Sequence, residues 1–334
     1  MNMLTLNDRS LFRQQAYING TWCDADGGKT SAVYNQASGA LLGHVPRMGA
    51  SETRRAIEAG NTARQTWRGL PAKDRSAILL RWQMLMLEHC DDLSAIITVE
   101  QRKSLTEARG EIIYAAAYLE WFAEETQRMH GDTIPASAQG HRILPTVEPI
   151  GVCAAITPGN FPFAMIARKV GPALAAGCSM IVNPDGLAPF SALALAALAE
   201  RAGVPAGVFN VVTGTTAAIG AEFTANALVR KLNFTVSTAA THHPMRQPSD
   251  RVKKLSLELG GNAPFIVFDD ADPDVMPAGI AVSKFSHSRQ ACVSVNRIYV
   301  QDEVYDVFTG NLTDAIKKFP KSTTLSKLAQ AKFP

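Results

Sequence analysis

The chain has 334 residues, 46% of them hydrophobic, which is enough for two domains with a large core. A formal net charge of +3 is close to neutral for this length, so charge gives no reason to expect a nucleic acid or an anionic membrane as partner. The five cysteines are odd in number and widely scattered. They indicate a reducing compartment and exclude a disulfide framework or a zinc-ligand spacing.

The first ten residues, MNMLTLNDRS, lack the apolar core of a signal peptide. Proline, glycine or charged residues interrupt the apolar stretches before they reach the ~20 residues of a membrane span. We therefore expect a soluble cytoplasmic protein without a resident metal ion.

Residues 11–50 read as short strands and turns, with a hairpin signal at Asn19-Gly20. Two amphipathic helices are expected next, the first of them behind an N-capping Asp74. Their apolar stripes predict core positions. The stripes are Ile78, Leu79, Trp82, Leu85 and Met86 in the first helix, and Ile112, Ile113, Ala116, Leu119 and Ala123 in the second.

The polar, proline-bounded stretch 133–147 predicts an arm outside the core. From Gly151 the pattern becomes an alternation of strand and helix, which is typical of a parallel sheet covered by helices. The expected strands are 151–156, 178–182 and 207–212, and the expected helices are 162–176, 189–202 and 215–226. Such sheets bind dinucleotides at the carboxyl ends of their strands, although no Gly-x-Gly-x-x-Gly fingerprint is present.

The stretch SKFSHSRQACVSVNR, residues 283–297, places Cys292 just before a short β-prone segment. A cysteine reacts as its thiolate, which nearby cations favour, and His287, Arg289 and Gln290 precede it. Cys292 is therefore a candidate nucleophile. The alternative is a buried structural cysteine, because free cysteine is among the most buried residue types.

Two further residues could complete a thiol site. Glu258 ends the apolar run of LSLELGG, where desolvation would suit a general base. Asn160 lies in ITPGNFP, a strand that stops at a proline-bounded turn, and its amide could donate to a developing oxyanion. The alternatives are a salt-bridged strand-end acid for Glu258 and a turn former for Asn160. Together with Cys292 they suggest thiol chemistry on a carbonyl.

Three longer stretches carry a resemblance to a known family: ALAAGC at 173–178, AGVPAGVFNV at 202–211 and ELGGNAPFIVF at 258–268. From about Asp8 to about Lys318 the chain resembles the aldehyde dehydrogenase superfamily, most closely its succinate-semialdehyde dehydrogenase branch. The resemblance implies an α/β fold, with a Rossmann-like parallel-sheet cofactor domain and an incomplete α/β catalytic domain.

The resemblance also implies roles for individual residues. Cys292 would be the nucleophile, Glu258 the general base, Asn160 the oxyanion donor, and Arg168 the residue that holds the carboxylate of succinate semialdehyde. The alternative for Arg168 is a solvated charge on a helix face. NAD or NADP would be the cofactor. The cofactor-binding positions implied are Thr157, Pro158, Asn183, Pro184, Asp185, Phe234, Val236, Ser237, Leu259 and Gly260.

The chain departs from the family pattern near the cofactor and the thiol. Asn183 stands where the family has a lysine for the adenosine ribose or its 2′-phosphate, and Asp185 would repel that phosphate. Val236 replaces a glycine before the expected pyrophosphate-binding helix, where close backbone approach favours glycine. Arg289 replaces a glycine near the nucleophile. The changes at Asn183, Asp185 and Val236 predict weaker cofactor binding, most of all for NADP, whereas Arg289 would either lower the pKa of the thiol or block the aldehyde.

We expect an NAD(P)-binding domain at 1–257, a partial catalytic domain at 258–318 and a divergent tail at 319–334. Within the first domain, 131–150 would form the arm that joins subunits into a homo-oligomer in the family, and the incomplete catalytic domain argues against the same assembly for this chain. The expected function is oxidation of an aldehyde, such as succinate semialdehyde in 4-aminobutanoate degradation, through a cysteine thioester. The alternative is a catalytically inactive truncated remnant, or a binding partner of an intact paralogue, and the change of character after Lys318 would suit a shifted reading frame.

Overall fold

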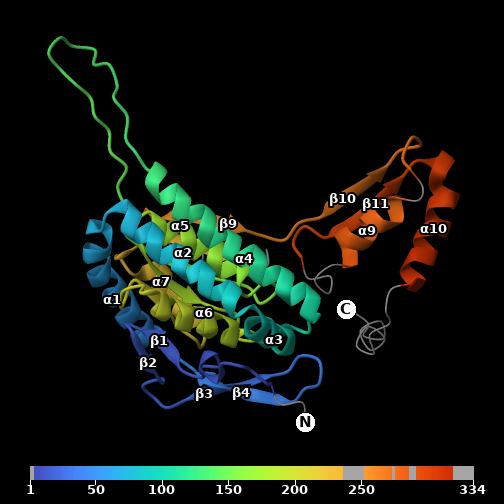
Figure 1. Cartoon of the computed structure of the whole chain (residues 1–334), viewed down its shortest axis with the longest axis horizontal. Coiled ribbons are helices and arrows are strands. Elements are labelled where there is room, and N and C mark those ends of the chain that lie inside the picture. The colour runs from blue at the N-terminus through green and yellow to red at the C-terminus, as the bar shows by residue number, and fades with distance from the viewer. Residues whose placement is uncertain (1–3, 236–251, 273–274, 286–290, 319–334) are drawn as a thin grey trace. The chain divides into compact units, whose positions relative to one another are not determined.

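A computed structural model describes residues 4–235, 252–272, 275–285 and 291–318. The chain divides into two compact units between Leu259 and Gly260, and each unit is described by itself (Figure 1). The first unit contains a seven-stranded sheet in the order β2-β1-β7-β6-β5-β8-β9. Its strands are β1 (Ala16–Ile18), β2 (Thr21–Cys23), β5 (Val152–Ile156), β6 (Ser179–Asn183), β7 (Phe209–Val211), β8 (Val229–Thr235) and β9 (Lys254–Glu258).

Strands β5 to β9 are mutually parallel, as the alternation of strand and helix predicts. The connecting helices also agree with the prediction to within about two residues at each end. They are α5 (Ala164–Ala175), α6 (Pro189–Ala202) and α7 (Thr216–Ala225). The fold class is therefore the predicted α/β class with a parallel sheet.

The side chains of the central strands point alternately to the two faces of the sheet. Cys153 and Ala155 of β5 belong to a core formed with α5, α6 and the helices outside them, whereas Val152 and Ala154 pack with α1 and α7. Both faces of β5 are buried, which explains its unbroken apolar sequence. The remaining helices of the first unit are α1 (Ala50–Gly69), α2 (Ala72–Glu88), α3 (Cys90–Gln101) and α4 (Leu105–Glu125).

The predicted hairpin at Asn19-Gly20 is confirmed. Ile18 pairs with Thr21, and both turn residues have positive φ, +54° for Asn19 and +73° for Gly20. A Cβ on Gly20 would also lie 2.7 Å from the Cβ of Ala206. Glycine is needed here for both reasons. A second hairpin pairs β3 (Thr30–Tyr34) with β4 (Leu41–Pro46).

The apolar stripes of α2 and α4 form core, with two corrections. Most stripe positions are fully or partly buried, but Ile113 is 58% exposed because it lies on the outer side of α4. Asp74 is not the N-cap of α2. The N-cap is Pro71. Asp74 lies in the first turn, where its negative charge interacts favourably with the positive end of the helix dipole.

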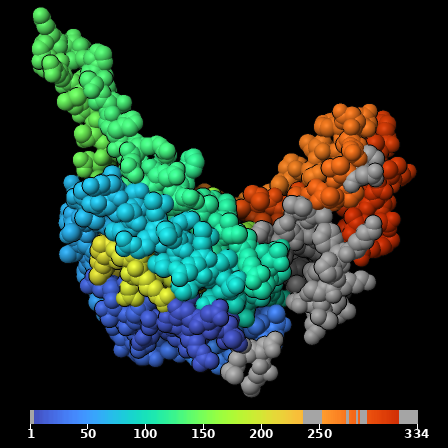
Figure 2. Space-filling view, in the orientation of Figure 1, coloured from blue at the N-terminus to red at the C-terminus, as the bar shows by residue number. Residues whose placement is uncertain are grey.

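The stretch 133–147 is an arm, as predicted from its polar sequence. All but one of its residues are exposed, and its two limbs meet at a bridge between Ile134 and Ile143 (Figures 1 and 2). A search of the described helices finds none with the length and apolar character needed to cross a bilayer.

The described part of the second unit contains two strands and two helices. β10 (Ala263–Val267) and β11 (Val295–Val300) are parallel neighbours, accompanied by α9 (Met276–Phe285) and α10 (Tyr305–Lys318). Its core is small. The core consists of Val267, Met276, Ile280 and Phe308. On the strands, Ile266 and Tyr299 are 58% and 52% exposed.

Two carboxylates from other helices cap the helices that follow β5 and β6. Glu111 of α4 accepts hydrogen bonds from the backbone amides of Phe163 and Ala164 at the start of α5. Glu100 of α3 accepts from the amide of Phe190 and from the amide and hydroxyl of Ser191 at the start of α6. Both caps satisfy amides of the first turn that have no partner within their own helix.

Helix α3 ends on a strained residue. Arg102, its C-cap, has φ +61° and ψ +13°, a left-handed conformation that most side chains disfavour by roughly 1–2 kcal/mol. The next residue, Lys103, is buried. The sharp turn at Arg102 thus brings the chain back into the interior.

Arg102→Gly is expected to raise the free energy of unfolding of the first unit by about 0.5–1 kcal/mol, because glycine loses the left-handed strain but gains entropy in the unfolded chain. Urea titration followed by tryptophan fluorescence measures this, since Trp22, Trp67, Trp82 and Trp121 all lie in the first unit. Arg102→Ala is the matched control because it keeps the Cβ. Equal stabilisation by alanine and glycine would contradict the strain argument.

Burial raises the pKa of Glu100 to about 8, against hydrogen bonds from Ser191 and Phe190 that lower it. Between about pH 4.5 and 8 the folded chain then binds a proton that the unfolded chain has lost. We expect the free energy of unfolding to fall across this window by up to ~1.4 kcal/mol per pH unit more in the wild type than in Glu100→Gln, which does not titrate. Urea titrations at pH 5, 6, 7 and 8 test this, and parallel curves for the two proteins would refute it.

Candidate active site

The carboxyl ends of the parallel strands bring several predicted residues to one edge of the first unit. Thr157 and Pro158 follow β5 directly, and the Thr157 amide donates to the Asn183 carbonyl at the end of β6, 3.1 Å away. Gly159 lies against Asp185, since a Cβ on Gly159 would be 3.3 Å from the Asp185 side chain. The loops after β5 and β6 are thus close neighbours at the carboxyl edge of the sheet, where sheets of this kind bind their ligands.

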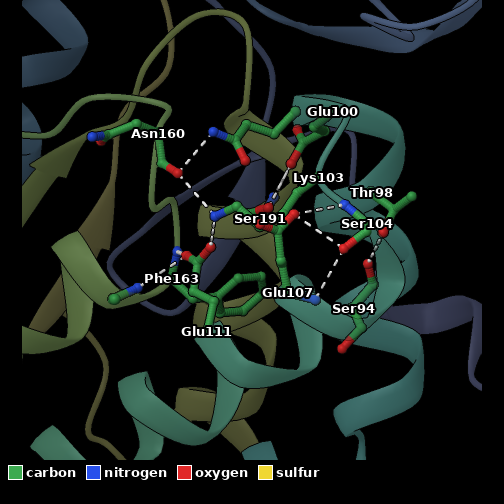
Figure 3. Close-up of polar contacts among 12 residues, drawn as sticks. Ser94, Thr98, Glu100, Lys103, Ser104, Glu107, Glu111, Asn160, Phe163 and Ser191 are labelled. Carbon is green, nitrogen blue, oxygen red and sulfur yellow. Dashed lines mark hydrogen bonds and ion pairs between the residues drawn. The ribbon is translucent and has the colours of Figure 1, made fainter. Parts of the chain in front are cut away.

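Asn160 lies in the turn between β5 and α5, and its backbone is firmly held. Its carbonyl oxygen accepts hydrogen bonds from Gln101 Nε2 at 2.7 Å and from Lys103 Nζ at 3.0 Å. Figure 3 shows these two nitrogens converging on the carbonyl, while the side-chain amide of Asn160 extends to the opposite side of the turn. Asn160 can therefore both form the turn and donate from its side-chain amide, because its backbone is held from one side and its side chain points to the other.

Glu258 is the last residue of β9, as predicted, but its environment differs from the expectation. Its side chain is 41% exposed, so the expected desolvation by an apolar run is wrong. Its carboxylate lies instead beside two cations of α5, with Oε2 3.3 Å from Arg168 Nη1 and Oε1 3.8 Å from Lys169 Nζ. The sequence missed this because β9 is the last strand in the sheet order and the open edge leaves its end accessible.

Arg168 is not a fully solvated charge, so that alternative is wrong. Its side chain is 30% exposed, its guanidinium lies 5.5 Å from the ring centroid of Tyr118, and the carboxylate it meets is Glu258. The aromatic face and the carboxylate orient the planar guanidinium.

Sequence reasoning missed Lys169. Its side chain is only 6% exposed, and burial lowers its pKa to about 8, helped by the positive charge of Arg168 and opposed by Glu258. A lysine so depressed is unusual and is a mark of functional sites. Its position inside the apolar pattern of α5, beside Arg168, was the available signal.

The side chains of the predicted cofactor-binding residues differ in burial and in hydrogen bonding. The Asn183 side chain is buried, with Nδ2 donating to the Val212 carbonyl at 2.9 Å, and the Asp185 carboxylate accepts from the Leu187 amide at 2.8 Å. The side chains of Phe234 and Pro184 are buried. Val236 and Ser237 lie outside the described residues.

Cys292 belongs to the second unit, whereas Asn160, Arg168 and Glu258 belong to the first. Cys292 is exposed, so the structural alternative of a buried cysteine is wrong. A Cβ on Gly261 would lie 3.2 Å from the Cys292 carbonyl, which shows how closely the segment before β10 passes the cysteine. His287, Arg289 and Gln290 lie outside the described residues.

Leu259 and Gly260 are exposed and stand at the division between the units. In the described part of the chain no group of three or more histidine, cysteine, aspartate or glutamate side chains could hold a metal ion. The first unit presents a carboxylate beside two cations and an amide on a fixed turn, and the second unit presents an exposed thiol.

Comparison with solved structures shows the same fold. A crystal structure described as an E. coli NADP dependent enzyme aligns with a TM-score of 0.93 and 58% identity, covering 94% of this chain and 65% of that one. The succinate-semialdehyde dehydrogenase from Burkholderia pseudomallei aligns with a TM-score of 0.93 and 56% identity over the same shares.

Curated relatives agree. The chain is 58% identical to succinate-semialdehyde dehydrogenase [NADP(+)] GabD of Escherichia coli and 57% identical to glutarate-semialdehyde dehydrogenase of Pseudomonas putida, each over 315 residues. It spans 65% and 66% of the lengths of these two proteins. The model of the aldehyde dehydrogenase family matches residues 22–329, which include part of the stretch 319–334 expected to diverge. The chain belongs to the aldehyde dehydrogenase family.

Proposed function

We propose that the chain catalyses NAD(P)-dependent oxidation of an aldehyde to an acid, with succinate semialdehyde or a close ω-carboxy aldehyde as substrate. The observation that carries the proposal is the cluster at the end of β9, where the Glu258 carboxylate lies beside Arg168 and Lys169. The names of the curated relatives favour this function over an inactive chain.

The substrate class follows from Arg168. Its planar guanidinium carries five N–H donors, so a substrate carboxylate can bind it while Glu258 keeps one contact. The Lys169 ammonium lies near Oε1 of Glu258, the oxygen that Arg168 does not contact. Its positive charge offsets the negative charge of the substrate carboxylate. An aldehyde with a carboxylate at its far end fits this balance of two cations and one fixed carboxylate.

In the proposed mechanism the Cys292 thiolate attacks the aldehyde carbon, and the Asn160 amide donates a hydrogen bond to the resulting oxyanion. The hydride that leaves this carbon would pass to a nicotinamide cofactor held at the carboxyl edge of the sheet. The acyl group then remains on Cys292 as a thioester. Glu258 takes a proton from water, the water oxygen bonds to the acyl carbon, and the bond to sulfur breaks.

The first unit fits a dinucleotide in part. Among the described residues, Asn183 Oδ1 and Thr235 Oγ1 are buried side-chain oxygens without a hydrogen-bond partner, and they end β6 and β8 at the edge where such cofactors bind. Asp185 beside them suits ribose hydroxyls, which can donate to a carboxylate, but repels a 2′-phosphate. We therefore propose NAD as the preferred cofactor.

Glu258→Gln is expected to stop turnover after a single acylation, because water attack on the thioester loses its base. With succinate semialdehyde and NAD, absorbance at 340 nm should rise by about one equivalent per chain and stop, and intact mass should show a succinyl group on Cys292. Glu222→Gln is the matched control, since Glu222 also pairs with an arginine, Arg54, but lies on α7. Steady turnover by Glu258→Gln at the rate of this control would refute the role of Glu258.

Asp185→Asn is expected to improve binding of NADP relative to NAD by roughly tenfold, because removing one charge near the 2′-phosphate is worth about 1 kcal/mol or more. Quenching of tryptophan fluorescence gives both dissociation constants. Asp24→Asn removes an exposed carboxylate on the far strands and should leave the ratio unchanged. An unchanged ratio in Asp185→Asn as well would show that Asp185 does not face the ribose.

A further inference from the structure

A buried ion pair lies beneath the Asn160 turn. The side chains of Lys103 and Glu111 are both 0% exposed, with Nζ and Oε2 2.5 Å apart. Taking two charges out of water costs several kcal/mol per ion, and apolar residues of similar size are often as stable as such a pair. The attraction between the two charges therefore adds little net stability, and their other contacts show what they do.

The other hydrogen bonds of the pair go to the backbone of one turn. Lys103 Nζ donates to the Asn160 carbonyl at 3.0 Å, and Glu111 Oε1 accepts from the Phe163 amide at 2.9 Å and the Ala164 amide at 3.3 Å (Figure 3). The Lys103 ammonium also lies 4.3 Å from the centroid of the Phe161 ring. The pair thus holds both the beginning and the end of the segment from Asn160 to Ala164.

Gln101 strengthens the hold on Asn160. Its Nε2 donates to the same carbonyl oxygen at 2.7 Å, so this one acceptor has two fixed donors from the chain around the end of α3. A carbonyl held by two donors cannot rotate without breaking both bonds. The two donors therefore fix the peptide group from which the Asn160 side chain extends to the opposite side of the turn.

We infer that Gln101, Lys103 and Glu111, the buried polar cluster, are positioning residues that aim the Asn160 amide at the oxyanion. The inference rests on the proposed role of Asn160. The charges are needed because an ammonium and a carboxylate make stronger and more directional bonds to the backbone than neutral groups do. The cluster does not touch the substrate.

The test uses two reactions of Cys292 that need no cofactor. With 4-nitrophenyl acetate the sulfur bonds to the carbonyl carbon through an oxyanion, and 4-nitrophenolate leaves with the electrons of the broken C–O bond. With iodoacetamide the sulfur displaces iodide and no oxyanion forms. The direction of the Asn160 side-chain amide should therefore affect the rate of the first reaction only.

The variant Lys103→Met with Glu111→Leu removes both charges and leaves neither unpaired. We expect release of 4-nitrophenolate to be slowed ten- to hundredfold and alkylation by iodoacetamide to be unchanged. Asp92→Asn is the matched control, because Asp92 is another buried carboxylate that accepts two backbone amides, those of Asn7 and Asp8, away from the turn. Its acylation rate should equal that of the wild type.

Asn160→Ala separates the two hypotheses. If it acylates as fast as the wild type, the proposed oxyanion role of Asn160 is wrong. If it is slowed and Lys103→Met with Glu111→Leu is not, only the positioning inference is wrong. When the changes are combined, the charge-removing pair should add no further slowing, because there is no amide left to aim.

A variant that fails to fold does not end the test. Gln101→Met keeps the ion pair and removes the 2.7 Å bond to the Asn160 carbonyl. It is expected to slow acylation three- to tenfold with alkylation unchanged. Wild-type acylation in this variant, with folding verified by tryptophan fluorescence, would overturn the inference for the cluster.

Discussion

The first unit depends on two buried glutamates that accept hydrogen bonds from the first amides of two helices. Helices α5 and α6 begin directly after the sheet edge, and their first amides would be buried without partners if Glu111 and Glu100 were absent. An unsatisfied buried amide costs about 1–3 kcal/mol. The caps therefore hold helices α3 and α4 to the edge where the predicted site residues lie.

The same caps restrict where an anion can bind. Helix N-termini commonly hold phosphates, but those of α5 and α6 already face carboxylates of the protein. We therefore expect the phosphates of the proposed cofactor to bind elsewhere along this edge. The Asn183 oxygen, which has no hydrogen-bond partner among the described residues, and the Asp185 carboxylate fit the proposal that ribose hydroxyls bind near the loops after β5 and β6.

The local sequence pattern was sufficient to predict the helices and strands from residue 151 onward and the places where the strands end. Hydrophobic periodicity and turn chemistry act over a few residues, so both can be read from the sequence. It was insufficient for the surroundings of Glu258. An apolar run predicted a desolvated carboxylate, whereas β9 closes the sheet at an edge and α5 supplies two cations. Which strand is last in a sheet depends on pairings between distant segments, and no local pattern records it.

The sequence by itself determined the α/β class, the Asn19-Gly20 hairpin and the candidates Asn160 and Glu258 at strand ends, since each follows from residues close in the chain. Only the tertiary structure decided that Lys103 and Glu111 are buried together under the Asn160 turn, and that Lys169 lies beside Glu258. In the sequence these are ordinary charged residues of helices. Packing removes the water around these residues, and a charge without water must be paired within the fold. Their partners are therefore known only from the tertiary structure.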